Sequence, residues 1–223
     1  MNTISPLGTQ ILEKHGCTVG QQVEDPDALL IRSADLHGAE FGPELLCIGR
    51  AGAGVNNIPI EDCAEKGIVV FNAPGANADA TKEMIIFDML LASRDMLGAI
   101  DWVNSIADKG DAVPALVEKG KSAFSGPELC GKSLGVIGLG AIGSLVANLA
   151  LEFGMTVRGY DPYISIESAW RLSRDVIHVD YVDEIFRTSD YISLNVPYNE
   201  STHHMIDAEA LAAMRPGVRI MNE

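Results

Sequence analysis

The stretch "KSLGVIGLGAIGSLVANLALEFGMTVRGYDPY", residues 132–163, constrains the fold of this 223-residue chain more than any other stretch. Its apolar residues 134–137 predict a strand that runs directly into the pattern Gly-x-Gly-x-x-Gly. Apolar residues at helical spacing follow, Gly154 ends the predicted helix, and "TVRGY" predicts a second strand. The order strand, glycine turn, helix, strand favours a parallel α/β sheet.

The three glycines of this turn have separate tasks in a dinucleotide-binding unit. Gly138 permits the tight turn out of the strand, Gly140 lets a pyrophosphate approach the backbone, and Gly143 lets helix and strand pack closely. Ala141 and Ile142 lie in the same turn, where a helix start presents unpaired N–H groups to a diphosphate. We expect all five residues to bind the cofactor. A glycine-rich turn that binds nothing remains the alternative.

Asp161 stands at the tip of the second predicted strand. A carboxylate there accepts hydrogen bonds from the ribose hydroxyls of adenosine, whereas a 2′-phosphate beside it would meet like charge. The sequence therefore predicts NAD rather than NADP.

The alternation of strands and helices continues to residue 222. Residues 176–179, 191–196 and 218–222 predict strands, and residues 181–190 and 207–214 predict helices. Five parallel strands are thus expected from Leu134 onward, in a Rossmann-type doubly wound sheet that normally has six. Ligands of such sheets lie at the carboxyl ends of the strands, so Val196, Pro197 and Thr202 are candidates for cofactor contact. An ordinary turn at the strand end is the alternative.

The first third of the chain predicts a smaller α/β unit. Strands are expected over residues 28–32, 45–49 and 67–71, with a helix over 59–67. The segment "NAPGANADA" breaks this pattern, and we place a domain crossing there, between residues 1–77 and 78–223. Residues 79–100 then predict one long helix with a broad apolar surface, which suits packing or an interface with a second copy.

Composition excludes several classes of protein. A formal net charge of −15 argues against binding duplex nucleic acid. The four cysteines form no C-x-x-C pair, which favours a reducing compartment, and no apolar run is long enough to suggest a membrane span. We expect a cytoplasmic protein without a metal site, because the His, Cys and carboxylate spacings match no metal-binding pattern.

Three segments together resemble one family. They are "IGRAGAGVNNIPIEDCAEKGIVVFNAPGANADATKE", "GLGAIGSLVANLALEFGMTVRGYDPY" and "SDYISLNVPYNESTHHMIDAEALAAMRPGVRIMN". In order and spacing they are similar to the D-2-hydroxyacid dehydrogenases, and within them to the phosphoglycerate-specific branch of serine biosynthesis. The resemblance implies an NAD-dependent oxidoreductase with a flavodoxin-like substrate domain at residues 1–77 and a Rossmann-type NAD domain at residues 78–223.

The resemblance also implies a substrate site. The loop of Gly52, Ala53 and Gly54 corresponds to one that offers backbone N–H groups to the substrate carboxylate beside the nicotinamide, and Ala53 would also contact the cofactor. Arg32 and Ser33 match a position near the substrate's anionic group, and a guanidinium suits a phosphate. A surface charge that caps a strand is the alternative for Arg32.

The family's catalytic arginine, acid and histidine lie after the strand that here spans residues 218–222, so we expect no catalytic residue within this chain. The five histidines are interpreted as solvent-facing or packing residues, and Arg50 as a structural or secondary residue. Two alternatives stay open: a D-lactate, glycerate or glyoxylate type enzyme of the same family, and an NAD-binding module without turnover. The apolar helix predicts a homodimer.

Overall fold

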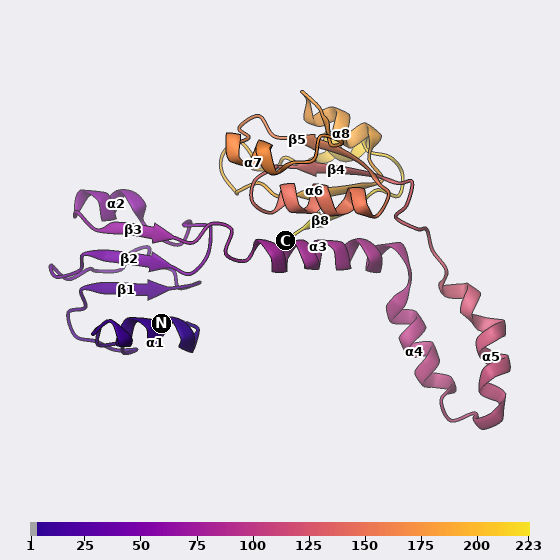
Figure 1. Cartoon of the computed structure of the whole chain (residues 1–223), viewed down its shortest axis with the longest axis horizontal. Coiled ribbons are helices and arrows are strands. Elements are labelled where there is room, and N and C mark those ends of the chain that lie inside the picture. Colours follow the sequence, from indigo (N-terminus) through magenta and orange to yellow (C-terminus); the bar gives the residue numbers. More distant parts are fainter. Residues whose placement is uncertain (1–3) are drawn as a thin grey trace. The chain divides into compact units, whose positions relative to one another are not determined.

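The structure, a computed structural model, describes residues 4–223 and divides into two compact units that meet in sequence between Asn77 and Ala78. Each unit has its own parallel sheet. The first sheet has the strand order β1-β2-β3 and the second the order β6-β5-β4-β7-β8 (Figure 1). The α/β class and the five strands expected from Leu134 onward are confirmed.

The first unit consists of three short strands and two helices. Its elements are α1 (Pro6–Lys14), β1 (Ala28–Ile31), β2 (Cys47–Arg50), α2 (Ile60–Glu65) and β3 (Val69–Asn72). Residues paired across the strands share a face, and one face holds the apolar core, which includes Ile31, Ile48 and Cys63 of α2. On the other face Phe71 is 58% exposed. The three-stranded sheet is therefore covered well on one side only.

The second unit has a sheet that is covered on both faces. Its strands are β4 (Ser133–Ile137), β5 (Thr156–Tyr160), β6 (Ile177–His178), β7 (Tyr191–Leu194) and β8 (Arg219–Asn222). Its principal helices are α3 (Ala78–Ser93), α6 (Gly143–Glu152), α7 (Ile166–Arg171), α8 (Val182–Thr188) and α9 (Ala208–Ala213). One apolar cluster joins α3 and α6 to the sheet, and another joins α8 and α9 to it. The central strand β4 is consequently buried along its whole length.

The single helix expected over residues 79–100 is wrong. Helix α3 ends at Ser93, and α4 (Met96–Ile106) begins after Asp95, whose side chain accepts a hydrogen bond of 2.9 Å from the Gly98 N–H. An aspartate in that position satisfies one of the free N–H groups of a new helix start. The apolar spacing runs across the break because both helices have apolar surfaces, so periodicity alone does not reveal it.

Helix α3 is fastened to the sheet near its end. The Ser93 hydroxyl lies 2.6 Å from the Tyr191 hydroxyl, and both side chains are buried. The Arg219 Nε donates to the Ala92 carbonyl at 2.7 Å, and its guanidinium lies over the Tyr191 ring. These bonds join the last turn of α3 to β7 and β8.

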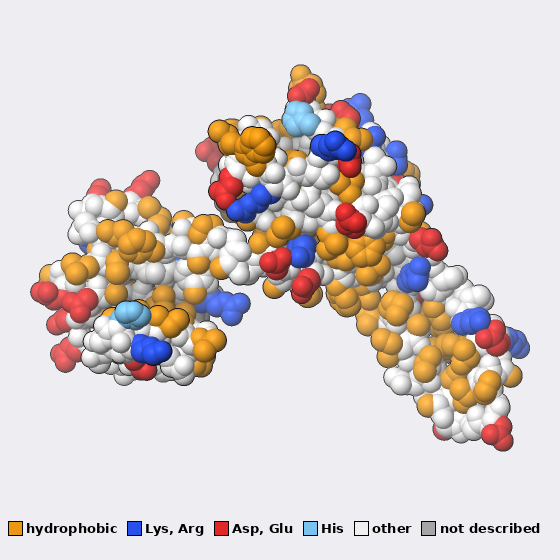
Figure 2. Space-filling view, in the orientation of Figure 1, with side chains coloured by type: hydrophobic (Ala, Val, Ile, Leu, Met, Phe, Trp, Pro, Cys, Tyr) orange, Lys and Arg blue, Asp and Glu red, His pale blue; other side chains and the backbone are white. Residues whose placement is uncertain are grey.

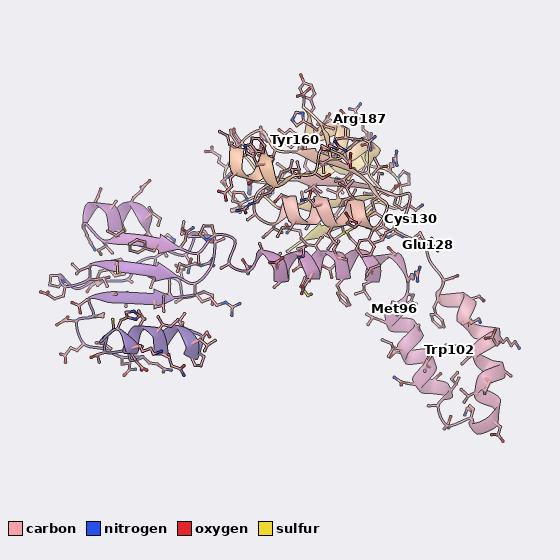
Figure 3. All side chains as sticks on the ribbon, in the orientation of Figure 1. Met96, Trp102, Glu128, Cys130, Tyr160 and Arg187 are labelled. Atoms are coloured by element: carbon pink, nitrogen blue, oxygen red, sulfur yellow. The ribbon has the colours of Figure 1, made fainter. Side chains whose placement is uncertain are left out.

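Beyond α4 the chain forms three further short helices. They are η1 (Gly110–Ala112), α5 (Val113–Gly120) and η2 (Lys121–Phe124). The ring of Trp102, labelled on α4 in Figure 3, lies 5.3 Å from that of Phe124. The other tryptophan, Trp170 on α7, is 85% exposed. None of the helices within residues 4–223 has the length and apolar character needed to cross a membrane.

Candidate functional site

The glycine turn after β4 is held by backbone contacts. A Cβ on Gly143 would lie 1.8 Å from the Gly138 carbonyl oxygen, and one on Gly138 would lie 2.6 Å from the Asn195 carbonyl oxygen. Gly138 also has a φ of +87°, which other residues rarely adopt. A Cβ on Gly140, by contrast, would meet no atom of residues 4–223 within 4 Å. The turn is thus closed on its protein side and open at Gly140, which fits the approach of a pyrophosphate.

The start of α6 adds a favourable field to this turn. Ile142 stands before the helix and provides no side-chain cap, and Ala141 is exposed beside it. The Ser144 hydroxyl donates to the Gly140 carbonyl at 2.7 Å, so no side chain caps the start of the helix. A ten-residue helix with an uncapped start carries about half a positive charge there. The arrangement suits a diphosphate.

Asp161 follows β5 and holds the same turn in place. One of its carboxylate oxygens accepts a hydrogen bond of 2.8 Å from the Leu139 N–H, between two of the glycines. The other accepts one of 2.9 Å from the Tyr163 N–H. Each carboxylate oxygen has a further acceptor site, so these bonds leave capacity for ribose hydroxyls. Asp161 therefore has a task in the turn besides the one that its position in the sequence suggests.

The loop after β7 lies against the glycine turn. The Cγ1 atom of Val196 is 2.9 Å from the position that a Cβ on Gly138 would take. The Thr202 hydroxyl donates to the Pro197 carbonyl at 2.6 Å and accepts from the Asn199 N–H at 2.9 Å. Of the three candidates in this loop, Val196 lines the turn, whereas Pro197 and Thr202 hold the two limbs of the loop together.

The turn after β2 in the first unit is fixed at its carbonyl groups. The Ala73 N–H donates to the Gly52 carbonyl at 2.9 Å, and the Asn72 side-chain amide donates to the Ala53 carbonyl at 2.7 Å. The carbonyl groups are thus satisfied within the unit. Successive N–H groups of such a turn can be offered to an anion.

The Arg50 side chain covers this turn. The interpretation of the sequence did not give Arg50 that role. Its Nε donates to the Arg32 carbonyl at 2.9 Å, and its Nη1 lies 2.3 Å from the position of a Cβ on Gly52 and 3.8 Å from that of a Cβ on Gly54. Arg32 and Ser33 follow β1 and are exposed. The Arg50 guanidinium therefore lies at the turn, and the exposed Arg32 follows the neighbouring strand, in a chain of net charge −15. The available signal was an arginine placed two residues before a Gly-x-Gly turn.

A charged cluster also lies where strands β4 and β7 begin, at the end of these strands opposite to the glycine turn. Asp190 accepts hydrogen bonds from the Ser133 N–H at 2.8 Å, from the Ser133 hydroxyl at 2.9 Å and from Arg215 at 3.1 Å. Burial disfavours the charged carboxylate, but these donors outweigh it and lower the pKa of Asp190. The cluster ties the beginnings of β4 and β7 together, away from the glycine turn, so its role is structural.

Within residues 4–223 no three His, Cys, Asp or Glu side chains are grouped to hold a metal ion. Two of the five histidines bind backbone carbonyls. The Nδ1 of His15 is 2.8 Å from the Ile11 carbonyl oxygen, and the Nε2 of His37 is 3.1 Å from that of Asn56.

Known relatives are similar to this chain in sequence. A curated D-3-phosphoglycerate dehydrogenase of Methanocaldococcus jannaschii is 38% identical over 205 residues, which are 91% of this chain and 37% of the relative. A hydroxypyruvate reductase of Thermotoga maritima is 40% identical over 203 residues, which are 90% of this chain and 61% of the relative. The chain thus spans about a third of the length of the first relative and three fifths of the second.

Solved structures are similar as well. D-lactate dehydrogenase from Aquifex aeolicus, complexed with NAD and lactic acid, superposes with a TM-score of 0.76 at 25% identity, covering 98% of this chain and 66% of that one. NAD⁺-bound 3-phosphoglycerate dehydrogenase from Entamoeba histolytica gives 0.66 at 30% identity, covering 89% and 55%. Residues 87–223 match the model of the D-isomer specific 2-hydroxyacid dehydrogenase NAD binding domain. The chain belongs to the D-isomer specific 2-hydroxyacid dehydrogenase family, and its cofactor is NAD.

Proposed function

We propose that this chain is part of an NAD-dependent dehydrogenase that converts 3-phospho-D-glycerate to 3-phosphohydroxypyruvate in serine biosynthesis. The observation that carries the substrate is the Arg50 guanidinium, which lies at the Gly52–Gly54 turn, together with the exposed Arg32 directly after the neighbouring strand β1. A turn of N–H groups suits one carboxylate, and planar guanidinium groups suit a phosphate. A substrate with both anionic groups uses all of these donors.

The cofactor's part in the proposed reaction is to accept a hydride from the carbon that bears the hydroxyl group. The chain's own residues bind and orient the cofactor. The backbone at Gly140 and the start of α6 receive the diphosphate, and Asp161 receives the adenosine ribose. Val196 limits the space beside Gly138.

The choice of NAD over NADP is tested at Asp161. Asp161→Ala removes the ribose acceptor and also frees the Leu139 N–H, so we expect NADH affinity to fall about tenfold to a hundredfold. Asp161→Asn is the matched control, because it keeps one side-chain oxygen for the turn but removes the charge. If the Asn variant binds NADPH better than the unmodified chain does, the charge argument stands. Unchanged NADH affinity in the Ala variant contradicts the proposed ribose contact.

Within the family the runner-up is a dehydrogenase for D-lactate, glycerate or glyoxylate. Relatives include a hydroxypyruvate reductase, and similar structures include a D-lactate dehydrogenase and a glyoxylate reductase. Such substrates carry no phosphate and need only one cationic partner. Calorimetric titration of the NADH-loaded chain with 3-phosphoglycerate and with D-lactate separates the two proposals.

In that titration we expect 3-phosphoglycerate to bind more tightly than D-lactate. Arg50→Gln should weaken phosphoglycerate binding about tenfold or more, because a charge-assisted hydrogen bond is lost. Arg171→Gln is the matched control, since Arg171 is an exposed arginine of the second unit that pairs with Glu167 on the same helix. Equal affinity for the two acids in all three proteins would favour the runner-up substrates.

A third possibility is a module that binds NAD without turnover. We propose that the catalytic residues are not among residues 1–223, and that this chain alone therefore binds NADH but does not oxidise phosphoglycerate. Fluorescence titration with NADH and a turnover assay on the same preparation test this. Turnover at rates typical of dehydrogenases would contradict the placement of the catalytic residues.

We further propose that two copies associate through the apolar faces of α3 and α4. Figure 2 shows hydrophobic side chains gathered along these helices. The exposed ones are Met84, Phe87, Leu90, Met96, Leu97, Ile100 and Val103. Contiguous exposed apolar surface of this kind marks interfaces. Sedimentation should show a dimer that Leu97→Glu dissociates. A monomer at micromolar concentration contradicts the proposal.

A further inference from the structure

The loop between β7 and α9 carries a cluster of aromatic rings that the proposed function does not use. The Tyr198 hydroxyl lies 2.7 Å from the Nδ1 of His203, and the two rings meet edge to face with centroids 5.6 Å apart. The His203 ring also stacks on that of His204, with centroids 3.7 Å apart. Tyr198 is 78% exposed. The cluster therefore closes the loop upon itself at the surface rather than within a core.

The backbone of this cluster is strained. His204 has a φ of +56°, in the left-handed region, and within residues 4–223 the only other non-glycine residue with positive φ is Asp25. Residues other than glycine keep such a conformation only where their surroundings hold it. The stack on His203 is the contact that holds the His204 ring. These ring contacts add to the hydrogen bonds that Asn199 and Thr202 make within the same loop.

The same loop forms one wall of the dinucleotide turn. The Asn195 N–H donates to the Ile137 carbonyl at 2.8 Å, immediately before Gly138. The Asn195 carbonyl and the Val196 side chain are the atoms nearest to the position of a Cβ on Gly138. Five residues further on, the Thr202 hydroxyl bonds back to the Pro197 carbonyl. Tyr198 is thus two residues from Val196, whose side chain lies at the wall of the turn.

We propose that Tyr198, through its hydrogen bond to His203, is a positioning residue for the dinucleotide site. The bond holds the loop so that Val196 stays against the glycine turn, and this raises the affinity for NADH without contact between Tyr198 and the cofactor. The inference rests on the proposed binding of NADH at the glycine turn and adds to it a residue outside that turn.

The test is a fluorescence titration of the full chain with NADH. Tyr198→Phe and His203→Ala should each weaken binding about three- to tenfold, the effect of one net hydrogen bond. The double variant should be no weaker than either single variant, because the two residues act through one bond. His203→Asn should restore most of the affinity, since its side-chain oxygen can take the place of Nδ1. Tyr181→Phe, at a tyrosine that is 75% exposed, is the matched control and should change nothing.

Failure of this inference and failure of NADH binding give different results. If the unmodified chain does not bind NADH, the proposed function is overturned, and the positioning role falls with it. If the unmodified chain binds NADH and Tyr198→Phe binds it equally well, the positioning role is overturned and the proposed function stands. Additive losses in the double variant, or losses that follow the melting temperature and that His203→Asn does not restore, also overturn it.

Discussion

The two sheets of this chain end in glycine turns that are held in different ways. In the five-stranded sheet, Gly143 packs against the backbone of Gly138, and the strand before the turn is buried on both faces. In the three-stranded sheet, the close neighbour of Gly52 is the guanidinium of Arg50, and Phe71 on the adjacent strand is exposed. The nearest neighbour of the glycine is therefore backbone in the cofactor turn, whereas in the turn proposed for the substrate it is a side chain that can move.

The largest effect on stability is expected from substitutions of the glycines in the two turns. Gly143→Ala places a methyl group on the Gly138 carbonyl, so we expect a loss of about 3 kcal/mol in the free energy of opening the five-stranded sheet. Gly52→Ala meets only the end of a flexible side chain and should cost less than about 1 kcal/mol. Hydrogen exchange of the strand amides in each sheet measures both. Equal losses would contradict the distinction between the two turns.

The next largest effect concerns one valine from each sheet, which differ in burial. Val157 on β5 is fully buried, and Val69 on β3 is 52% exposed. Val157→Ala should cost about 2 kcal/mol, because buried methyl groups are lost and a cavity remains. Val69→Ala should cost less than about 0.5 kcal/mol. The same exchange experiment decides. A large effect at Val69 would show that the open face of the first sheet is covered in solution.

A smaller effect depends on pH. The pKa of Asp190 is lower in the folded chain than in the unfolded chain. Its contribution to the free energy of unfolding is therefore fully present above the pKa that Asp190 has in the unfolded chain, and it is lost as the pH falls through the pKa of folded Asp190. Asp190→Asn should therefore cost about 1–2 kcal/mol at pH 7, and the difference should shrink below about pH 4. Urea denaturation across that range measures it. Asp183→Asn, in an exposed pair with Arg187, is the control and should change little. A pH-independent difference contradicts the argument.

The smallest effect concerns the strained loop. His204→Gly and His204→Ala both remove the stack on His203, but only glycine adopts a φ of +56° without cost. The glycine variant should be the more stable of the two by about 1 kcal/mol. The difference in melting temperature between the variants measures this, and equal values would show that the backbone there is relaxed in solution.

The strands and the glycine turn were predictable because their signals are local. A short apolar run followed by glycines at fixed spacing predicts β4, Gly138 and the start of α6 without knowledge of the rest of the chain. The break between α3 and α4 was not predicted, since the apolar spacing continues across it. Asp95, three residues before Gly98, was the only local sign.

Contacts between distant residues were beyond the reach of the sequence pattern. Arg50 bonds to the carbonyl of Arg32, eighteen positions earlier, because β1 and β2 are neighbours in the sheet. Spacing along the chain does not specify that a side chain folds back over Gly52. The second task of Asp161, at the Leu139 N–H, was missed for the same reason.

The two tryptophans give the chain a built-in optical probe of its cofactor. Trp170 is exposed on α7, a short distance in sequence after Asp161, whereas Trp102 on α4 lies against Phe124 of η2. Because reduced nicotinamide absorbs indole emission, bound NADH quenches each tryptophan according to its distance. Trp170→Phe and Trp102→Phe each leave one emitter, so energy transfer in the two variants gives the distance from each tryptophan to the reduced ring.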